Sequence, residues 1–328
     1  MTKTTFQSVI DALLETGKPF PKKYLPYFSD IDPASLKLLL DAWPRVSLTV
    51  KRTLLDELDA LLHDDTIVSF DDLARALLTD PDGPVRAGAI RLLAECEDVK
   101  LLPFYEKILA SDPDPETRAE AANVLNLFVD LGELEEISED AYRRAEDALL
   151  AAFRDDDADV RRRALESLGY SSRPEVPPLI EAAFAREDPD WAASAIIAMG
   201  RSSDERWSEQ IVRSLLSVDR AERLEAVKAA GSLALPAARL PLLQMLDEED
   251  DTAIFSAVVW SLSQVGGEDV RTYLENLLDQ TEDEEEIAFI EEALDNLSFT
   301  EDLERFDLLA VDPDEDLEEM DELDEEEE

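Results

Sequence analysis

The sequence has very few residues of several types that particular classes of protein require. Its 328 residues include one cysteine, one histidine and nine glycines, and 31 lysines and arginines stand against 80 aspartates and glutamates. A single cysteine excludes a disulfide framework and a cysteine-only metal cluster within one chain. The shortage of cations, with a formal net charge of −49, argues against a nucleic-acid binder, because such a protein needs a basic face that replaces the counterions of phosphate.

Long hydrophobic runs are also missing. Near-apolar stretches such as AASAIIAMG are far shorter than the roughly 20 residues that cross a bilayer, and the amphipathic N-terminus lacks the continuous apolar core of a signal peptide. The acidity disfavours adsorption to an anionic membrane. We therefore expect a cytoplasmic protein whose partners include neither nucleic acid nor a membrane.

The acidic residues are concentrated at the C-terminal end. Residues 1–245 carry 29 basic and 46 acidic side chains, whereas residues 246–328 carry 2 and 34, a net charge of −32. Of the 17 residues from 312 to 328, 13 are acidic. Such a run repels itself and contains too few apolar residues to fold. We expect residues 312–328 to form a disordered acidic tail.

What the sequence contains in abundance is one repeated pattern. Seven segments begin with an aspartate and place an apolar residue eleven positions later, at intervals of 32, 43, 31, 31, 32 and 32 residues. The aspartates are Asp82, Asp114, Asp157, Asp188, Asp219, Asp251 and Asp283. Each is typical of a helix N-cap, and small or branched residues seven and eight positions later, such as Ala121 and Ala122, continue an apolar helical stripe. We therefore predict a helix after every cap.

Further helices are predicted between the capped ones, because apolar doublets such as Leu77–Leu78 precede the next cap. Each repeat is then a pair of antiparallel helices that buries its stripes only by stacking on its neighbours. The expected fold class is all-α, an α-solenoid. In a more divergent pair before the seven, Ser47 takes the cap position. We expect an N-terminal helical cap over residues 1–31, about eight helix pairs over 32–300, and a capping helix over 301–311.

The repeats follow the pattern Asp-x-x-Val-Arg-x-x-Ala-Ala-x-Ala-Leu-Gly, seen as DADVRRRALESLG and more loosely as DGPVRAGAIRLLA. This pattern resembles the short HEAT-like repeats named after phycobilisome lyases, over residues 32–300. The resemblance implies a right-handed superhelix of HEAT-like helical hairpins. It also implies a ladder in which the arginine after valine binds turn carboxylates of adjacent repeats. The matching arginines are Arg86, Arg118, Arg161 and Arg223. The pattern fails at Ala192, Phe255 and Ile287, so we expect the ladder only in the N-terminal half.

The family that the repeats resemble includes two kinds of enzyme. Deoxyhypusine hydroxylase holds two irons with His–Glu pairs, and a chain whose only histidine is His63 cannot build that site. Bilin lyases act largely by binding and presenting a chromophore, and no bilin-specific signature is recognisable here. Cys96 falls on an apolar helical stripe and is expected to fill space. With no phosphate-binding loop, nucleophile elbow or zinc spacing, we expect no enzyme, no catalytic residues, no cofactor and no metal.

The second helix of each pair carries the candidate site. Residues nine and thirteen positions after each cap are expected to face the concave side of the solenoid. Most of them are polar, and the large apolar exceptions indicate partner contacts. The candidate partner-binding residues are Leu127, Tyr170, Ile197, Arg201, Lys228, Trp260 and Gln264. If this facing is off by one position, Trp260 belongs to the core instead.

Two arginines exceed what the repeat requires. Arg162 and Arg163 follow Arg161 in the densest basic cluster of the chain, and they are added to the candidate partner-binding residues. We expect either that they attract the acidic tail or that the turn carboxylates from Asp155 to Asp159 neutralise them.

These observations favour a non-catalytic protein–protein interaction scaffold or adaptor that binds a partner on its concave face. The acidity of the chain predicts that this partner is another protein with a basic segment. Two alternatives stay open. One is an acidic chaperone or assembly factor for a basic protein, and the other is a bilin lyase-like protein that attaches a chromophore.

Overall fold

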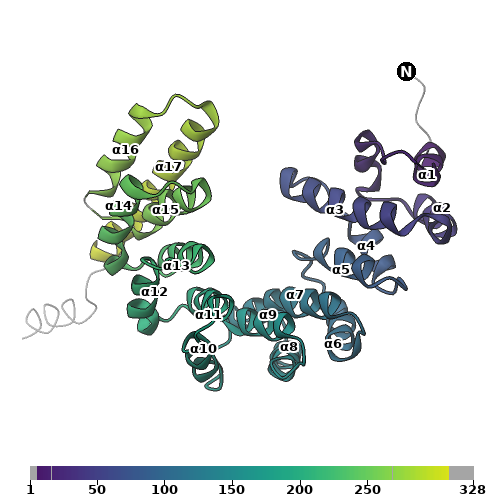
Figure 1. Ribbon diagram of the computed structural model, residues 1–328, viewed down its shortest axis with the longest axis horizontal. Coiled ribbons are helices and arrows are strands. Elements are labelled where there is room, and N and C mark those ends of the chain that lie inside the picture. The colour runs from purple at the N-terminus through teal and green to yellow at the C-terminus, as the bar shows by residue number, and fades with distance from the viewer. Residues whose placement is uncertain (1–5, 16, 268, 310–328) are drawn as a thin grey trace, which may run out of the picture. The chain divides into compact units, whose positions relative to one another are not determined.

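The computed structural model describes residues 6–15, 17–267 and 269–309, and the regular structure in these ranges consists of helices (Figure 1). The all-α prediction is confirmed. The predicted acidic tail, residues 312–328, lies outside the described residues. The chain divides into two compact units, residues 1–183 and 184–328, and each is described by itself.

Unit 1 begins with two helical segments that contact each other through aromatic rings. These segments are α1 (Phe6–Leu14) and the 3-10 helix η1 (Lys22–Phe28). The rings of Phe6 and Phe28 meet edge to face with their centroids 6.1 Å apart, and Phe28 is fully buried. Because α1 packs on α2 and η1 packs on α3, these segments cover the first helix pair.

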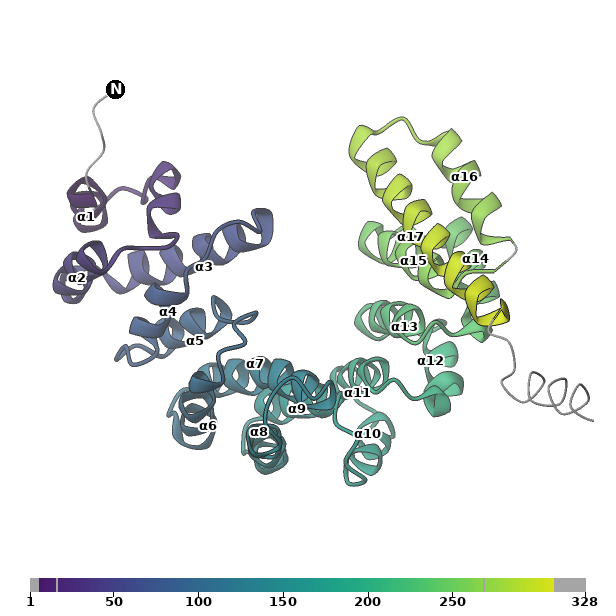
Figure 2. The ribbon, with the colours of Figure 1, turned by 180° about the vertical axis from the view of Figure 1, so that it is seen from behind.

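From residue 33 the chain of unit 1 alternates between first and second helices. The first helices are α2 (Pro33–Ala42), α4 (Asp71–Leu77), α6 (Leu102–Ser111) and α8 (Glu139–Ala152). The second helices are α3 (Leu48–Asp64), α5 (Gly83–Arg91), α7 (Pro115–Glu133) and α9 (Ala158–Leu168), and the remaining elements are η2 (Trp43–Arg45), η3 (Val99–Leu101) and α10 (Val176–Phe184). Figure 2 shows α5, α7 and α9 side by side in one layer. The first helices α6 and α8 form a second layer that packs against α7.

Unit 2 continues the same alternation. Its second helices are α11 (Pro189–Arg201), α13 (Arg220–Ser232), α15 (Thr252–Val265) and α17 (Glu284–Leu309). Its first helices are α12 (Ser208–Ser214), α14 (Arg239–Glu248) and α16 (Val270–Gln280), with η4 (Glu205–Trp207) and η5 (Pro236–Ala238) between elements. Each second helix packs on the next one along the chain. Residues 301–309, expected within a capping helix, are the last turns of α17.

The predicted caps begin the second helices. The carboxylate of Asp157 accepts hydrogen bonds from the N–H groups of Asp159 and Val160 at 2.8 and 3.2 Å. Side-chain caps of this kind also occur at Ser47, Asp114, Asp188, Asp219, Asp251 and Asp283. Asp82 differs, because its carboxylate receives two hydrogen bonds from Arg52 at 2.9 and 2.7 Å. The side-chain capping prediction is therefore confirmed except at Asp82.

Small residues allow successive second helices to approach closely. A Cβ atom on Gly200 would lie 2.9 Å from the Cβ of Ala229, and one on Gly231 would lie 2.9 Å from the Cα of Ser261. Beside this second contact, Ser261 Oγ donates a hydrogen bond to the Val227 carbonyl at 2.8 Å. The glycine twelve positions after the cap is thus required by the spacing of the helices.

One second helix is shorter than predicted. α5 ends at Arg91, where the chain continues in tight turns and the N–H of Leu93 donates to the carbonyl of Ile90 at 3.0 Å. Two glycines among its nine residues weaken this helix. Cys96 therefore lies in a turn, where its half-buried thiol accepts a hydrogen bond from Arg75 at 3.2 Å. The prediction that Cys96 continues a helical stripe is wrong.

Candidate functional site

Charged side chains join neighbouring repeats at the turns before the second helices. Each rung links the fourth residue after one cap to a carboxylate two residues before the next cap. Arg86 donates to both carboxylate oxygens of Asp112 at 2.8 and 2.6 Å. One repeat further on, Arg118 donates to both oxygens of Asp155 at 2.9 and 2.8 Å. These two rungs confirm the ladder that the family resemblance implies.

The same guanidinium groups also hold their own turns. Arg86 Nη1 donates to the Asp80 carbonyl at 2.7 Å, and Arg118 Nη1 donates to the Asp112 carbonyl at 2.9 Å. The carboxylate of Asp112 in turn accepts the N–H of Asp114 at 3.0 Å. The side chains of Arg86 and Asp112 are largely buried, and the hydrogen bond to Asp112 raises the pKa of Arg86 above its usual value. Each rung is therefore a structural element of the repeats.

The ladder begins one repeat earlier than its matching arginines. Lys51, four residues after the Ser47 cap, forms a buried ion pair with Asp80 at 3.2 Å. The same carboxylate accepts the indole N–H of Trp43 at 2.7 Å. The first rung was missed in the sequence because it uses lysine in place of arginine, although its register position is the same.

The ladder also extends differently towards the C-terminus. Arg161 donates instead to the carbonyls of Asp155 and Asp156 at 2.6 and 3.0 Å. The residue two positions before the next cap is Arg186, which has no acceptor to offer a guanidinium. In unit 2 the ladder is present again, where Arg223 donates to Glu249 at 3.0 Å. The prediction of a ladder confined to the N-terminal half is wrong, because acceptor position as well as arginine position decides where a rung forms.

The residues nine and thirteen positions after each cap define what we call the second-helix face. In unit 1 they are Asp56, Ala60, Arg91, Glu95, Asn123, Leu127, Glu166 and Tyr170. All of these are half-buried or exposed except Glu166, which is buried. The candidates Leu127 and Tyr170 are half-buried, Leu127 within α7 and Tyr170 two residues after the end of α9.

Four carboxylates surround a single guanidinium on the second-helix face of unit 1. Arg91, at the end of α5, lies 3.2 Å from Glu120 and 3.8 Å from Glu116 of α7. It also lies 3.3 Å from Asp56 and 3.9 Å from Asp59 of α3. Asp56 and Glu116 remain largely exposed, with 67% and 58% of their side-chain surface accessible. This part of the face therefore has more negative than positive charge.

Local carboxylates engage the two additional arginines of α9. Arg162 forms an ion pair with Asp159, and Arg163 Nη1 donates to Glu166 at 2.7 Å. Both partners belong to the same helix as the arginines. Neutralisation by the turn carboxylates from Asp155 to Asp159 is therefore confirmed for Arg162, whereas Arg163 pairs with Glu166, outside that range. The tail that the other expectation invoked lies outside the described residues.

In unit 2 the second-helix face consists of Ile197, Arg201, Lys228, Ser232, Trp260, Gln264, Glu292 and Asn296. The candidates Ile197 and Arg201 are half-buried on α11. Lys228 is exposed on α13 and forms an ion pair with Glu225 at 2.8 Å. Leu127, Arg162, Arg163 and Tyr170 thus belong to unit 1, and the other five candidates belong to unit 2.

Trp260 and Gln264 lie one turn apart on α15. The Trp260 ring faces Phe289 of α17, with the ring centroids 6.4 Å apart and the planes inclined by 32°. Trp260 is half-buried, whereas the other three tryptophans of the chain are buried. Gln264 packs on α13, because its Oε1 would lie 2.5 Å from a Cβ atom on Gly231. Trp260 is therefore an accessible residue, and the alternative that placed it in the core does not describe it.

Phe289 is a residue that sequence reasoning missed. It lies six positions after the Asp283 cap, outside the two register positions considered for the second-helix face. Residues six and nine positions after a cap are three apart and share one helical face. Adding the sixth position to the register would have placed Phe289 on the same face of α17 as Glu292, but its contact with Trp260 of α15 depends on how the two helices stack.

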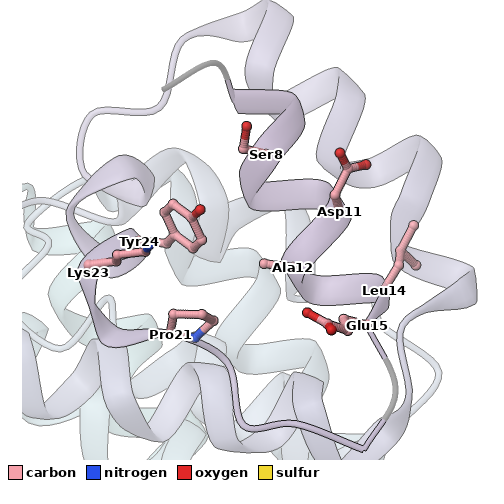
Figure 3. Close-up of a pocket in the computed structure, with 8 residues that line it drawn as sticks. All are labelled: Ser8, Asp11, Ala12, Leu14, Glu15, Pro21, Lys23 and Tyr24. Carbon is pink, nitrogen blue, oxygen red and sulfur yellow. The ribbon is translucent and has the colours of Figure 1, made fainter. Parts of the chain in front are cut away.

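A pocket of about 650 Å³ opens between α1 and η1 at the start of unit 1 (Figure 3). It is lined by Ser8, Asp11, Ala12, Leu14, Glu15, Pro21, Lys23 and Tyr24. The ammonium group of Lys23 lies 4.9 Å from the ring centroid of Tyr24, and Asp11 and Glu15 of α1 line the other side of the pocket. None of the predicted site residues lines this pocket, so it is separate from the second-helix face.

The histidine and the cysteine each have their own set of neighbours. His63 Nδ1 lies 2.8 Å from the carbonyl oxygen of Asp59, one turn earlier on α3, and this hydrogen bond raises its pKa. Burial raises the pKa of the Cys96 thiol, and Arg75 binds both Cys96 and Asp98. In the described part of the chain, no hydrogen bond joins His63 to Cys96.

Stacked helix pairs with capped second helices, small residues between them and a ladder across their turns define an α-solenoid repeat protein. The chain belongs to the HEAT-repeat family, because a sequence model of HEAT repeats matches residues 70–141, 146–217 and 207–295. This match confirms the resemblance drawn from the repeat pattern. Within the ranges that the structure describes, no helix is both long and apolar enough to span a bilayer.

Two solved structures are similar to this chain at low sequence identity. The complex of CpcE and CpcF of phycocyanin lyase from Nostoc sp. PCC7120 is 17% identical with a TM-score of 0.52, and the match covers 86% of this chain and 97% of that one. Human deoxyhypusine hydroxylase is 16% identical with a TM-score of 0.35, and the match covers 79% and 95% of the two chains. A comparison with curated protein sequences gives no match. At 17% identity, the similarity to the phycocyanin lyase complex establishes the fold alone.

Proposed function

We propose that this protein is a non-catalytic interaction scaffold whose second-helix face binds a basic segment of a partner protein. HEAT-repeat proteins bind other proteins, which supports the general role. The observation that carries the basic segment is the group of four carboxylates from α3 and α7 around the single guanidinium of Arg91. A lysine or arginine of the partner adds positive charge at this position, where four carboxylates share one guanidinium.

Electrostatic complementarity of this kind contributes to the rate and specificity of association. Asp56 and Glu116 are exposed, so a partner reaches them without breaking the core of the repeats. Contacts at exposed carboxylates each contribute roughly 0.2–1 kcal/mol, and they weaken as salt rises. Several such contacts along the face are needed for stable binding, which is why an extended segment fits this surface better than a single side chain.

The positions of the histidine and the cysteine support a role without catalysis. A nucleophile and its general base must lie within hydrogen-bond reach of each other. His63 instead contacts the backbone of its own helix, and the pKa of Cys96 is raised by burial, which disfavours the reactive thiolate. We place the protein in the cytoplasm, because a chain with a single cysteine forms no internal disulfide and suits a reducing compartment.

An acidic chaperone for a basic protein is a second candidate function, favoured by the net charge of −32 in residues 246–328. Such a chaperone holds its client mainly through this charge, so binding depends on the C-terminal residues more than on the face of unit 1. The lyase alternative draws on fold similarity alone. A coloured covalent adduct after incubation with a bilin is the result that would establish it.

Affinity capture with charge-reversed variants tests the scaffold proposal. The double substitution D56K/E95K reverses two exposed charges of the second-helix face in unit 1. We expect partner proteins captured by the full chain to be depleted by about tenfold or more with this variant, since each unfavourable charge contact weakens binding by a factor of several. Quantitative mass spectrometry of the captured proteins measures the effect.

A control variant with the same change of charge is E136K/E181K. Glu136 and Glu181 are exposed in unit 1 but lie outside the second-helix face. We expect it to capture the same partners as the unaltered chain. If both double variants lose the same proteins equally, overall charge governs binding, and the second-helix face of unit 1 is not a specific site. If neither loses any, the second-helix face of unit 1 is not the binding surface.

A further inference from the structure

The four tryptophans of the chain differ in what lies over their rings. Lys51 lies 4.9 Å from the ring centroid of Trp43, and two other tryptophans have an arginine over the ring. These are Trp191 with Arg186 at 4.0 Å and Trp207 with Arg206 at 5.9 Å. Trp260 has Phe289 beside it instead, and no lysine or arginine of the described residues lies over its ring. Among the described residues, Trp260 therefore has an aromatic ring as its neighbour where the other three tryptophans have a cation.

Carboxylates flank this aromatic pair on α17. Glu285, Phe289 and Glu292 are spaced by four and three residues, so they share one face of the helix. Both glutamates are exposed. An aromatic face attracts a cation through its quadrupole, and a carboxylate binds the same cation by charge and hydrogen bonding. The two features together form the environment that a positively charged side chain requires.

The surrounding part of the chain does not supply that cation. Between residues 246 and 302 the only basic residue is Arg271, and Glu301 binds it at 2.8 Å. On the neighbouring helix α13, Lys228 is paired with Glu225 at 2.8 Å. The two basic residues named here are thus already paired, so a cation for Trp260, Glu285 and Glu292 can be supplied by another molecule.

We propose that Trp260 and Phe289, with Glu285 and Glu292, form a recognition site for an arginine side chain in the basic segment of a partner protein. This inference rests on the proposed function and adds to it the residue type that unit 2 recognises. A guanidinium is planar, so it stacks on the tilted pair of rings while its N–H groups reach the carboxylates. A lysine ammonium, which is compact and strongly hydrated, gains less from the ring surface.

Binding of synthetic peptides to the full chain tests this site. The probe is a fluorescein-labelled Gly/Ser peptide that carries several arginines, and its binding is followed by fluorescence anisotropy at about 50 mM salt, where exposed charge contacts are screened less than at physiological salt. Matched peptides replace every arginine by lysine or by citrulline, the neutral isostere. We expect the arginine peptide to bind more tightly than the lysine peptide, and the citrulline peptide to bind at least about tenfold more weakly than the arginine peptide.

Substitutions in the site are compared with a control outside it. We expect W260A to weaken the arginine peptide about tenfold, and W260F to recover most of that loss, because a cation–π contact in a partly desolvated site is of this order. E285Q/E292Q removes the charge without removing packing, so it reports on the site even if W260A unfolds the chain. Tyr273, an exposed aromatic residue of α16, is the control, and Y273A is expected to bind like the unaltered chain.

Three results would overturn the arginine site. They are equal affinity for the arginine and citrulline peptides, equal affinity for the arginine and lysine peptides, and unchanged affinity in both W260A and E285Q/E292Q. If this happens while D56K/E95K still depletes the captured partners, the arginine site is wrong and the proposed scaffold function stands. If D56K/E95K has no effect but W260A weakens the arginine peptide, the binding surface lies in unit 2 alone.

Discussion

Arg86 stabilises two repeats at once, because its guanidinium binds the turn of its own repeat and the Asp112 carboxylate of the next. Removing the arginine leaves a buried carboxylate without its cation, which typically costs about 3–5 kcal/mol. We expect R86M to lower the urea midpoint by a corresponding amount, and D112L in the same chain to restore a large part of it. Urea denaturation followed by circular dichroism measures both changes.

Arg161 offers a matched comparison at the same register position. Its guanidinium donates to two backbone carbonyls, which are neutral acceptors. R161M therefore leaves two carbonyls without a donor, but no buried carboxylate without its cation. We expect the loss in R161M to be about 1–3 kcal/mol, smaller than that in R86M. Equal losses at the two positions would show that the carboxylate rungs contribute nothing beyond the hydrogen bonds to the turns.

The close contacts between second helices lead to a prediction at the scale of the element. A Cβ atom on Gly231 would lie 2.5 Å from Gln264 Oε1 and 2.9 Å from the backbone of Ser261, so α13 and α15 must move apart to admit it. We expect G231A to destabilise the chain by about 1–3 kcal/mol, although alanine is the better helix former. S232A, at the exposed next position of α13, should leave the thermal midpoint nearly unchanged. A stabilised G231A variant would mean that α13 and α15 are not in close contact there.

The sequence predicted the elements best where local chemistry decides them. Caps, apolar stripes and small residues are properties of single positions, and they located every second helix. The end of α5 was missed because the competition between a helix and tight turns depends on packing around Leu93 and Cys96. The rungs depend on two positions far apart in sequence. Arg161 has the expected residue type, but Arg186 occupies the acceptor position.

The candidate site was predictable only in part, for the same reason. Register positions nine and thirteen gave Trp260 and its accessible face, since they follow from helical periodicity. Phe289 and the carboxylates around Arg91 come from neighbouring helices, so they required the stacking of repeats to be known. Whether a surface residue binds a partner also depends on that partner, and no pattern within one chain contains this information.

At the scale of the whole molecule, charge is the dominant property. A chain that ends at Leu309 lacks the 13 acidic residues between 312 and 328, and its formal net charge changes from −49 to −36. Because like charges repel one another in the compact state, we expect the shortened chain to melt a few degrees higher at low salt, and the difference to shrink as salt screens the charges. Differential scanning calorimetry of both chains over a salt series measures this. A difference that does not vary with salt would show that residues 310–328 act through packing instead.

The ladder has a consequence for how such a chain changes during evolution. Each rung joins the fourth residue after one cap to the second residue before the next, so it specifies a register and not a particular pair of repeats. Deleting one complete repeat would place Arg86 opposite Asp155 in the role of Asp112, with the same geometry available. The rung between Arg118 and Asp155 already spans the longest interval, 43 residues from cap to cap, and keeps both hydrogen bonds. Where both register positions hold the residues of a rung, duplication or loss of a whole repeat can therefore change the length of this protein without leaving an unmatched charge at the junction.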